Sequence, residues 1–228
     1  MPIKQIPVYE RILKANDFIA EENRRLFVQK KVCVISLMSS PGAGKTSLLE
    51  RTAERLLEKK LRMAVLVGDL ATTRDAERLS KYPIPAVQLT TGGACHLEAQ
   101  QIAQAVKDMD LDGLDFLFIE NVGNLVCPAS YDLGESSRVV MLSVPEGDDK
   151  PQKYPTAFRR SQLLILNKID LLPYLSYDVG KVFAEATALN PRLQTLSLSC
   201  TSGEGLDGWI EYLEAQRVAM QARENGAG

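Results

Sequence analysis

The stretch Ser39-Ser-Pro-Gly-Ala-Gly-Lys-Thr46 follows an apolar, β-branched run over residues 32–38 and precedes a helical pattern over 46–59. It matches the P-loop pattern except at its first position, where serine replaces glycine. In such a loop, successive backbone N–H groups point inward at phosphate oxygens, and the following helix adds its positive N-terminus. A strand, a glycine-rich turn and a helix in this order predict a nucleotide-binding α/β domain.

The residues of this loop have different expected tasks. Gly42 and Gly44 allow a close backbone approach that a Cβ would obstruct. Lys45 is expected to contact the β- and γ-phosphates and so to serve catalysis, and the Thr46 hydroxyl is expected to bind Mg²⁺. The predicted nucleotide contacts of the loop are Pro41, Gly42, Ala43, Gly44, Lys45, Thr46 and Ser47.

Strand-like apolar runs recur outward from the loop and alternate with helical segments. We predict these strands at residues 62–67, 116–119, 139–144, 163–166 and 195–198, the last pattern being the weakest. A helix is predicted over 206–222. Alternation of this kind implies crossover connections, and hence a mainly parallel central sheet flanked by helices. Such sheets bind ligands at the carboxyl ends of their strands, and the motifs discussed below follow predicted strands.

The motif Asn167-Lys-Ile-Asp170 follows one of these strands and indicates which base is bound. Guanine presents two donors on one edge, an N1–H and an exocyclic amine, and a single carboxylate can accept from both. Adenine does not offer that pair, so the motif favours GTP over ATP. Asp170 is expected to accept from guanine, with the Lys168 stem along the base plane and Asn167 bracing the loop. The loop expected to back the base follows the last predicted strand and comprises Ser199, Cys200 and Thr201.

Carboxylates between these two motifs are candidates for the magnesium site. Mg²⁺ prefers oxygen ligands and keeps several waters, so one or two of Asp69, Asp75 and Glu120 suffice. Asp69 or Asp75 is alternatively expected to position the attacking water. Gly123 is expected to donate its backbone N–H to the γ-phosphate and so to sense hydrolysis. The competing interpretation of each acid is a solvated loop residue.

The predicted switch region has no glutamine in the usual water-positioning place and no obvious arginine finger. Turnover is therefore expected to be slow, or to be completed by a partner subunit. We hypothesise that Lys153 reaches the nucleotide across a dimer.

Cysteine and histidine suggest a second chemistry. Cys95 and His96 are adjacent, and Cys127 lies seven positions after Glu120. Thiolate and imidazole suit Zn²⁺ and Ni²⁺ better than Mg²⁺. Three ligands are too few for a closed tetrahedral site, so two chains related by a two-fold axis would pool them into a shared, labile site. The alternative is two buried cysteines and a histidine that caps a helix. Cys33 falls within a predicted strand and is expected to be structural.

Length and composition fit one ordinary globular domain with an extension. The 228 residues carry 27 basic and 29 acidic side chains, and a net charge of −2 gives no support for a nucleic-acid or membrane partner. Residues 1–29 lack the apolar core of a signal peptide, so we expect a cytoplasmic location. We divide the chain into a helical N-terminal extension over 1–30 and a P-loop GTPase domain over 31–228.

The combination of motifs resembles the HypB family, the hydrogenase nickel-incorporation GTPases. Its elements are the P-loop, Gly92-Gly-Ala-Cys-His96, Glu120-Asn-Val-Gly-Asn-Leu-Val-Cys-Pro128, Ala129-Ser-Tyr-Asp-Leu-Gly-Glu135 and Asn167-Lys-Ile-Asp170. The resemblance covers roughly residues 39–209 and implies a signal-recognition-like P-loop GTPase that dimerises with nucleotide. It also implies a Ni²⁺ or Zn²⁺ site at the dimer interface, formed by Cys95, His96 and Cys127.

The resemblance further implies partners and a task. These are a second copy of the chain, a small zinc-containing nickel chaperone docked through the N-terminal extension and, indirectly, the hydrogenase large subunit. GTP hydrolysis is expected to couple dimerisation to metal affinity during nickel delivery to a NiFe hydrogenase. Some family members carry a cysteine-rich or histidine-rich N-terminal nickel segment. Residues 1–31 contain neither residue type, which favours metal transfer through the GTPase domain over nickel storage.

Two alternatives compete with this interpretation. A urease-type nickel GTPase is expected to carry a Cys-Pro-His motif, whereas this chain has Cys127-Pro128-Ala129. A metal-binding scaffold with vestigial GTPase activity would not need an intact Lys45 and Asp170. Both features favour the hydrogenase interpretation.

Overall fold

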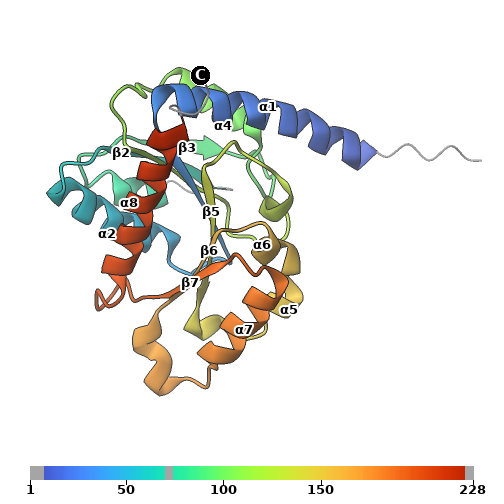
Figure 1. The fold of residues 1–228 in the computed structure, drawn as a ribbon, viewed down its shortest axis with the longest axis vertical. Helices are drawn as coiled ribbons and strands as arrows, with labels where there is room; N and C mark the ends of the chain where they lie inside the picture. Colours follow the sequence, from blue (N-terminus) through green and yellow to red (C-terminus); the bar gives the residue numbers. More distant parts are fainter. Residues whose placement is uncertain (1–7, 70–73, 224–228) are drawn as a thin grey trace, which may run out of the picture.

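The computed structural model describes residues 8–69 and 74–223, and its centre is a seven-stranded sheet (Figure 1). The strand order is β3-β2-β4-β1-β5-β6-β7, and every neighbouring pair is parallel. The strands are β1 Cys33–Ser39, β2 Met63–Asp69, β3 Ala86–Thr90, β4 Phe116–Glu120, β5 Ser137–Ser143, β6 Leu163–Asn167 and β7 Gln194–Ser197. The predicted fold class, a parallel α/β sheet with flanking helices, is confirmed.

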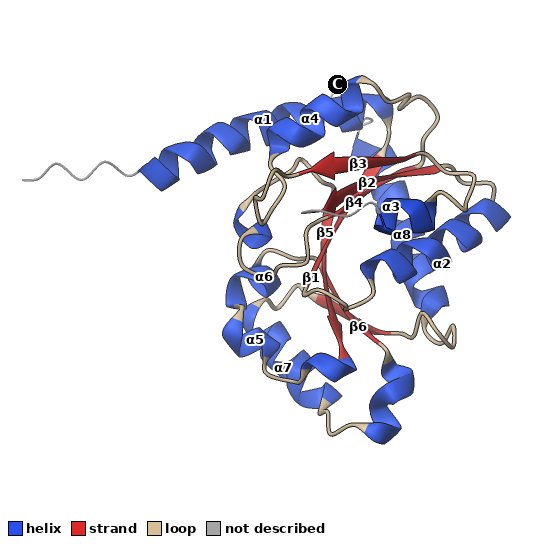
Figure 2. Cartoon of the chain, turned by 180° about the vertical axis from the view of Figure 1, so that it is seen from behind, coloured by secondary structure: helices blue, strands red, loops and turns tan. Residues whose placement is uncertain are grey.

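Helices cover both faces of the sheet, as Figure 2 shows from behind. They are α1 Val8–Lys30, α2 Lys45–Glu58, α3 Arg74–Leu79, α4 Ala99–Lys107, α5 Lys150–Lys153, α6 Pro155–Arg159, α7 Val179–Leu189 and α8 Leu206–Arg223. Because side chains alternate along a strand, Ile35 of β1 packs in the core cluster with α2 and α8, while its neighbour Val34 packs in the cluster with α4. Within the described residues, no helix combines the length and apolarity that a membrane span requires.

The strands predicted from the sequence all occur, within two residues at either end. One observed strand, β3, was not predicted from the sequence. β3 is the edge strand beside β2, and its side chains are half-buried or exposed. Polar Gln88 and Thr90 interrupt its apolar run, so the pattern of a fully buried strand is absent there.

Helix α1 is confirmed, but its apolar residues do not form one buried stripe. Ile12 is 46% exposed and Phe18 is 67% exposed. The N-terminal part of α1 extends past the rest of the molecule (Figure 1). The polar side chain of Asn23 is buried instead and donates to the carbonyls of Ala99 and Leu133, at 2.9 and 3.2 Å. Hydrogen bonds therefore help to fix the second half of this helix, which helical periodicity alone did not indicate.

Trp209 on α8 is the largest fully buried side chain of the described residues, and its indole N–H donates to Thr52 Oγ1 at 2.9 Å. Trp209→Ala is expected to lower the free energy of unfolding by about 3–5 kcal/mol, because a large cavity opens between α2 and α8. Urea unfolding followed by circular dichroism measures this, since the chain has no second tryptophan for fluorescence. Val218→Ala, at a position 61% exposed on the same helix, is the control and should change stability by under ~0.5 kcal/mol. Equal losses in the two variants would contradict the prediction.

Candidate functional site

Two adjoining cavities lie where β1, β4 and β6 end. The first has a volume of about 430 Å³ and is lined by Pro41, Gly42, Gly44, Lys45, Thr46, Ser47, Gly68, Asp75, Arg78, Glu120, Asn121, Val122, Gly123 and Lys168. The second has about 440 Å³ and is lined by Gly44, Ser47, Glu50, Arg51, Glu54, Lys81, Tyr82, Asn167, Lys168, Cys200 and Thr201. The fold therefore gathers around these two cavities the P-loop, Asn167 and Lys168 of the predicted base-selecting motif, and three of the four predicted magnesium ligands, Thr46, Asp75 and Glu120. Asp170 lines neither cavity.

Asn167 ties the P-loop to the loop after β7. Its side-chain amide donates to the carbonyl of Ala43 at 2.9 Å, and its oxygen accepts from the backbone N–H of Cys200 at 3.2 Å. Gly44 has a φ of 103°, and a Cβ there would lie 2.5 Å from Asn167 Nδ2. Glycine is thus required both by the backbone conformation and by the close approach of Asn167.

The other residues of the predicted base-selecting motif are also held in place. The ammonium group of Lys168 donates to the carbonyl of Gly42 at 2.7 Å, so its stem crosses from one loop to the other. Asp170 accepts from the hydroxyl of Ser199 at 2.5 Å, and that hydroxyl in turn accepts from the backbone N–H of Thr201. This orients the Asp170 carboxylate before any base is bound.

Glu120 is a buried carboxylate beside the P-loop, 3% exposed. One oxygen accepts from the hydroxyl of Thr46 at 2.9 Å, and the other, Oε2, has no hydrogen-bond partner among the described residues. Burial raises the pKa of Glu120 to about 7, and the nearby Lys45 ammonium only partly offsets this effect. A buried, unpartnered carboxylate oxygen next to a hydroxyl fits a hard divalent cation such as Mg²⁺.

Three other predicted site residues differ in where they lie. Asp75 lines the first cavity from α3. Asp69 ends β2, but its side chain lies outside the described part of the structure. Lys153 lines neither cavity; its ammonium group pairs with Asp149 at 2.5 Å on the surface of α5. One chain does not bring Lys153 to its own hollow, so a role across a dimer stays a prediction.

Arg78 is a cation of the first cavity that the sequence analysis missed. Its guanidinium donates to the hydroxyl of Ser47 at 2.9 Å and to both carboxylate oxygens of Glu50. Arg78 lies three residues after Asp75, so both share one face of α3. That spacing was the signal available in the sequence. Its position beside the P-loop suits contact with a phosphate.

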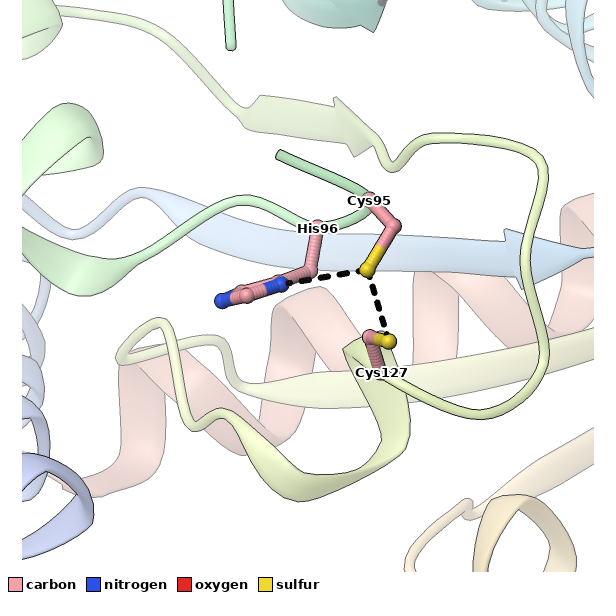
Figure 3. Close-up of side chains that lie close together, drawn as sticks. All are labelled: Cys95, His96 and Cys127. Carbon is pink, nitrogen blue, oxygen red and sulfur yellow. Dashed lines mark hydrogen bonds between the residues drawn. The ribbon is translucent and has the colours of Figure 1, made fainter. Parts of the chain in front are cut away.

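Cys95, His96 and Cys127 form a second cluster (Figure 3), in which their ligand atoms all lie within 4.8 Å of one another. The thiol of Cys95 donates to Cys127 Sγ at 2.7 Å, which raises the pKa of Cys95, and its sulfur is 3.8 Å from His96 Nδ1. The three predicted ligands thus converge within one chain. His96 caps no helix, because Glu98 is the residue at the start of α4. Cys33 is fully buried in β1, as predicted.

One segment connects the two clusters. It leaves β4 at Glu120, and a Cβ on Gly123 would meet Pro41 Cα of the P-loop at 3.0 Å. Four residues later the segment reaches Cys127, while Asn124 donates to the carbonyl of Cys95 at 3.2 Å. The same few residues therefore touch the phosphate cradle at one end and both cysteine loops at the other.

Comparison with known proteins places the chain in a family. Residues 33–197 match the family described as CobW/HypB/UreG, nucleotide-binding domain. The hydrogenase maturation factor HypB of Escherichia coli (strain K12) is 51% identical over 208 residues, which cover 91% of this chain and 71% of that protein. This chain belongs to the HypB family. Its matched region is the nucleotide-binding domain of that family.

Two solved HypB structures resemble the fold closely. HypB from Archaeoglobus fulgidus superposes with a TM-score of 0.84 at 38% identity, covering 90% of this chain and 100% of that one. HypB from Helicobacter pylori, solved in complex with nickel, gives a TM-score of 0.84 at 41% identity, covering 92% and 96%. The HypB resemblance seen in the sequence motifs is thereby confirmed at the level of the fold.

The buried Glu120 makes the stability of the nucleotide-free, metal-free chain depend on pH. Its folded pKa lies above its ordinary value of 4.5, so the stability it contributes is present below about pH 4.5 and is lost as pH rises through about 7. Glu120→Gln should therefore stabilise the chain by roughly 1–3 kcal/mol at about pH 8 and leave it nearly unchanged at about pH 5. Urea unfolding across this range measures the difference.

Glu58→Gln, at an exposed position on α2, is the matched control and should follow the wild type at each pH. If the stability of Glu120→Gln depended on pH in the same way as that of the wild type, the raised pKa of Glu120 would not contribute to the pH dependence, and the prediction would be wrong.

Proposed function

We propose that this chain is a magnesium-dependent GTPase that hydrolyses GTP to GDP and phosphate and uses the reaction to control nickel transfer during NiFe hydrogenase maturation. One observation carries the proposal. The segment from Glu120 to Cys127 begins in the nucleotide hollow and ends in the soft-metal cluster, with Gly123 against the P-loop. A movement of the P-loop or of Gly123 on loss of the γ-phosphate would therefore be passed along four residues to Cys127.

The hollow supports phosphate binding and hydrolysis. Backbone N–H groups of the P-loop, Lys45 and the N-terminus of α2 supply positive charge for the phosphates. Thr46 and Glu120, with Asp69 or Asp75, would hold Mg²⁺, which supplies charge neutralisation to the phosphates when it is bound. Asp69 or Asp75 would orient the attacking water. Water-positioning by an aspartate, without a glutamine, is consistent with slow turnover.

The cargo proposal rests on the three soft ligands. Two thiols and an imidazole in one chain suit Ni²⁺ or Zn²⁺, and a fourth position is left for water, a second chain or an acceptor. The nickel complex of the Helicobacter pylori relative supports nickel as the cargo. We infer that GTP promotes a homodimer across this region, and that hydrolysis moves the segment after Glu120 and shifts metal affinity. By linkage, Ni²⁺ must then change GTP affinity by the same factor.

The proposed partners follow from the same task. They are a second copy of this chain, a small zinc-containing nickel chaperone and, indirectly, the hydrogenase large subunit, all in the cytoplasm. The exposed apolar residues of α1, Ile12 and Phe18, are the proposed contact for the chaperone.

The decisive experiment is a Ni²⁺ titration with measurement of molecular mass, run in GDP and in a non-hydrolysable GTP analogue. A nucleotide-dependent dimer whose nickel affinity shifts several-fold supports the proposal, and Cys127→Ala should abolish the nickel signal. Equal nickel affinities in both nucleotide states would show that nucleotide state and metal affinity are not coupled. GTP turnover at background level, with nickel and Mg²⁺ present, would favour a metal-binding scaffold instead.

Base selection can be tested at Asp170. Asp170→Asn removes the acceptor pair for guanine and should weaken GDP binding by about 100-fold or more, since each charged hydrogen bond contributes roughly 1.5–3 kcal/mol. An asparagine amide can donate to xanthine, whose carbonyl replaces the guanine amine, so xanthosine diphosphate should bind the variant better than GDP does. Fluorescent-nucleotide displacement measures both affinities. Unchanged GDP binding would remove Asp170 from the site.

A further inference from the structure

The two nitrogens of His96 lie in different surroundings. Nδ1 faces the sulfur of Cys95 at 3.8 Å, while the opposite end of the ring points away from both cysteines (Figure 3). Nε2 is buried and has no hydrogen-bond partner within the described residues, and Glu98 Oε1 lies 3.5 Å from it. The hydrogen-bonding capacity of this buried nitrogen is therefore unused in this conformation, although a carboxylate lies close to it.

The ring of Tyr131 packs against the ring of His96. The two rings stack with centroids 3.9 Å apart and an angle of 30° between their planes. The backbone of Tyr131 is itself fixed, because its carbonyl accepts from Arg138 Nη2 at 2.8 Å. Arg138 is 7% exposed and pairs with Glu135, so the backbone that carries the Tyr131 ring is hydrogen-bonded to a buried ion pair.

We propose that Glu98 and Tyr131 are positioning residues of the soft-metal site. Glu98 accepts from Nε2–H of His96 and thereby makes Nδ1 the atom offered to the metal, and the Tyr131 ring holds the imidazole in the plane that points Nδ1 at the two sulfurs. Neither residue touches the metal. This inference rests on the proposed role of Cys95, His96 and Cys127 as metal ligands.

Coordination distances support the choice of Nδ1. In a tetrahedral site with metal–sulfur bonds of ~2.3 Å and metal–nitrogen bonds of ~2.0 Å, sulfur and nitrogen ligands lie ~3.6 Å apart. Cys95 Sγ and His96 Nδ1 are 3.8 Å apart, already close to that spacing. The two sulfurs, at 2.7 Å, must separate by about 1 Å, whereas the histidine needs almost no movement. The imidazole is thus the pre-positioned ligand, and Glu98 and Tyr131 are what position it.

A histidine that binds a metal through one nitrogen commonly donates its other N–H to a carboxylate, which fixes the tautomer and raises ligand basicity. Closing the 3.5 Å gap between Nε2 and Glu98 by about 0.6 Å gives an ordinary hydrogen bond. Loss of such an outer partner typically weakens metal affinity 10–100-fold.

Glu98 also caps α4, and the test must separate the two tasks. Its side chain accepts from the backbone N–H of Gln101, and the Gln101 side chain accepts from the backbone N–H of Glu98, in a reciprocal capping box. Gln101→Ala removes half of this box and leaves the Glu98 carboxylate in place. It is therefore the matched control for helix capping.

The experiment measures Ni²⁺ affinity of the whole chain, without nucleotide, by competition with a chromophoric chelator. The thiolate-to-nickel charge-transfer absorption is recorded alongside, and circular dichroism checks folding. Glu98→Ala and Tyr131→Ala should each weaken Ni²⁺ binding by about 10-fold or more and change the absorption bands. Glu98→Gln and Tyr131→Phe, which keep an acceptor and a ring, should recover most of the affinity. Gln101→Ala should bind as the wild type does.

Three results overturn the inference. Wild-type affinity and spectrum in folded Glu98→Ala and Tyr131→Ala exclude a positioning role, while the proposed metal transfer still stands. A loss in Gln101→Ala equal to that in Glu98→Ala assigns the effect to helix capping. A wild-type chain whose Ni²⁺ binding is absent, or survives Cys127→Ala, overturns this inference together with the proposed ligand set.

Discussion

The hydrogen bond between Thr46, at the start of α2 after the P-loop, and Glu120, the last residue of β4, holds the candidate site together. β1 and β4 are neighbours in the sheet, so the P-loop after β1 and the carboxylate that ends β4 must meet at one edge. Satisfying one oxygen of a buried carboxylate and leaving the other unpaired is costly in the isolated chain. A cation bound beside the unpaired oxygen would offset that cost. The unpaired oxygen of Glu120 would therefore both lower the stability of the cation-free chain and offer a ligand to a cation.

From this contact the chain runs from Glu120 to Cys127 with no helix or strand between them, and the short turn Pro128–Ser130 begins directly after Cys127. Asn121 stabilises the route, because its side-chain oxygen accepts from the backbone N–H groups of Leu97 and Val122. The carboxylate of Glu120 and the thiol of Cys127 are therefore only seven positions apart in the chain. Carboxylate and hydroxyl oxygens lie beside the P-loop, and two thiols lie at Cys95 and Cys127, so the chemistry of the two groups suits different kinds of metal ion.

The parts of this architecture that depend on local sequence could be predicted. The P-loop, the motif ending at Asp170 and six of the seven strands have signatures that lie within a few consecutive residues. What could not be predicted depends on partners distant in sequence. β3 is an edge strand with no continuous apolar pattern. The buried Asn23 of α1 donates to the carbonyls of Ala99 and Leu133, which are distant from it in the sequence. The stacking of Tyr131 on His96 likewise joins residues 35 positions apart. Arg78 was within reach of the sequence, since helical spacing from Asp75 places it on the cavity face.

The asparagine on α1 has a mechanical consequence. Ala99 lies three residues after His96, and Leu133 lies two residues after Tyr131, so the amide of Asn23 bridges the two loops that bring the imidazole and its stacking ring together. Asn16, two turns earlier on the same helix, accepts from the N–H of Ala99 and donates to the carbonyl of Asp132. α1 therefore braces the two chain segments that carry His96 and Tyr131. A displacement of α1 would therefore be transmitted through the side-chain amides of Asn16 and Asn23 to the segments that hold the His96 imidazole and the Tyr131 ring.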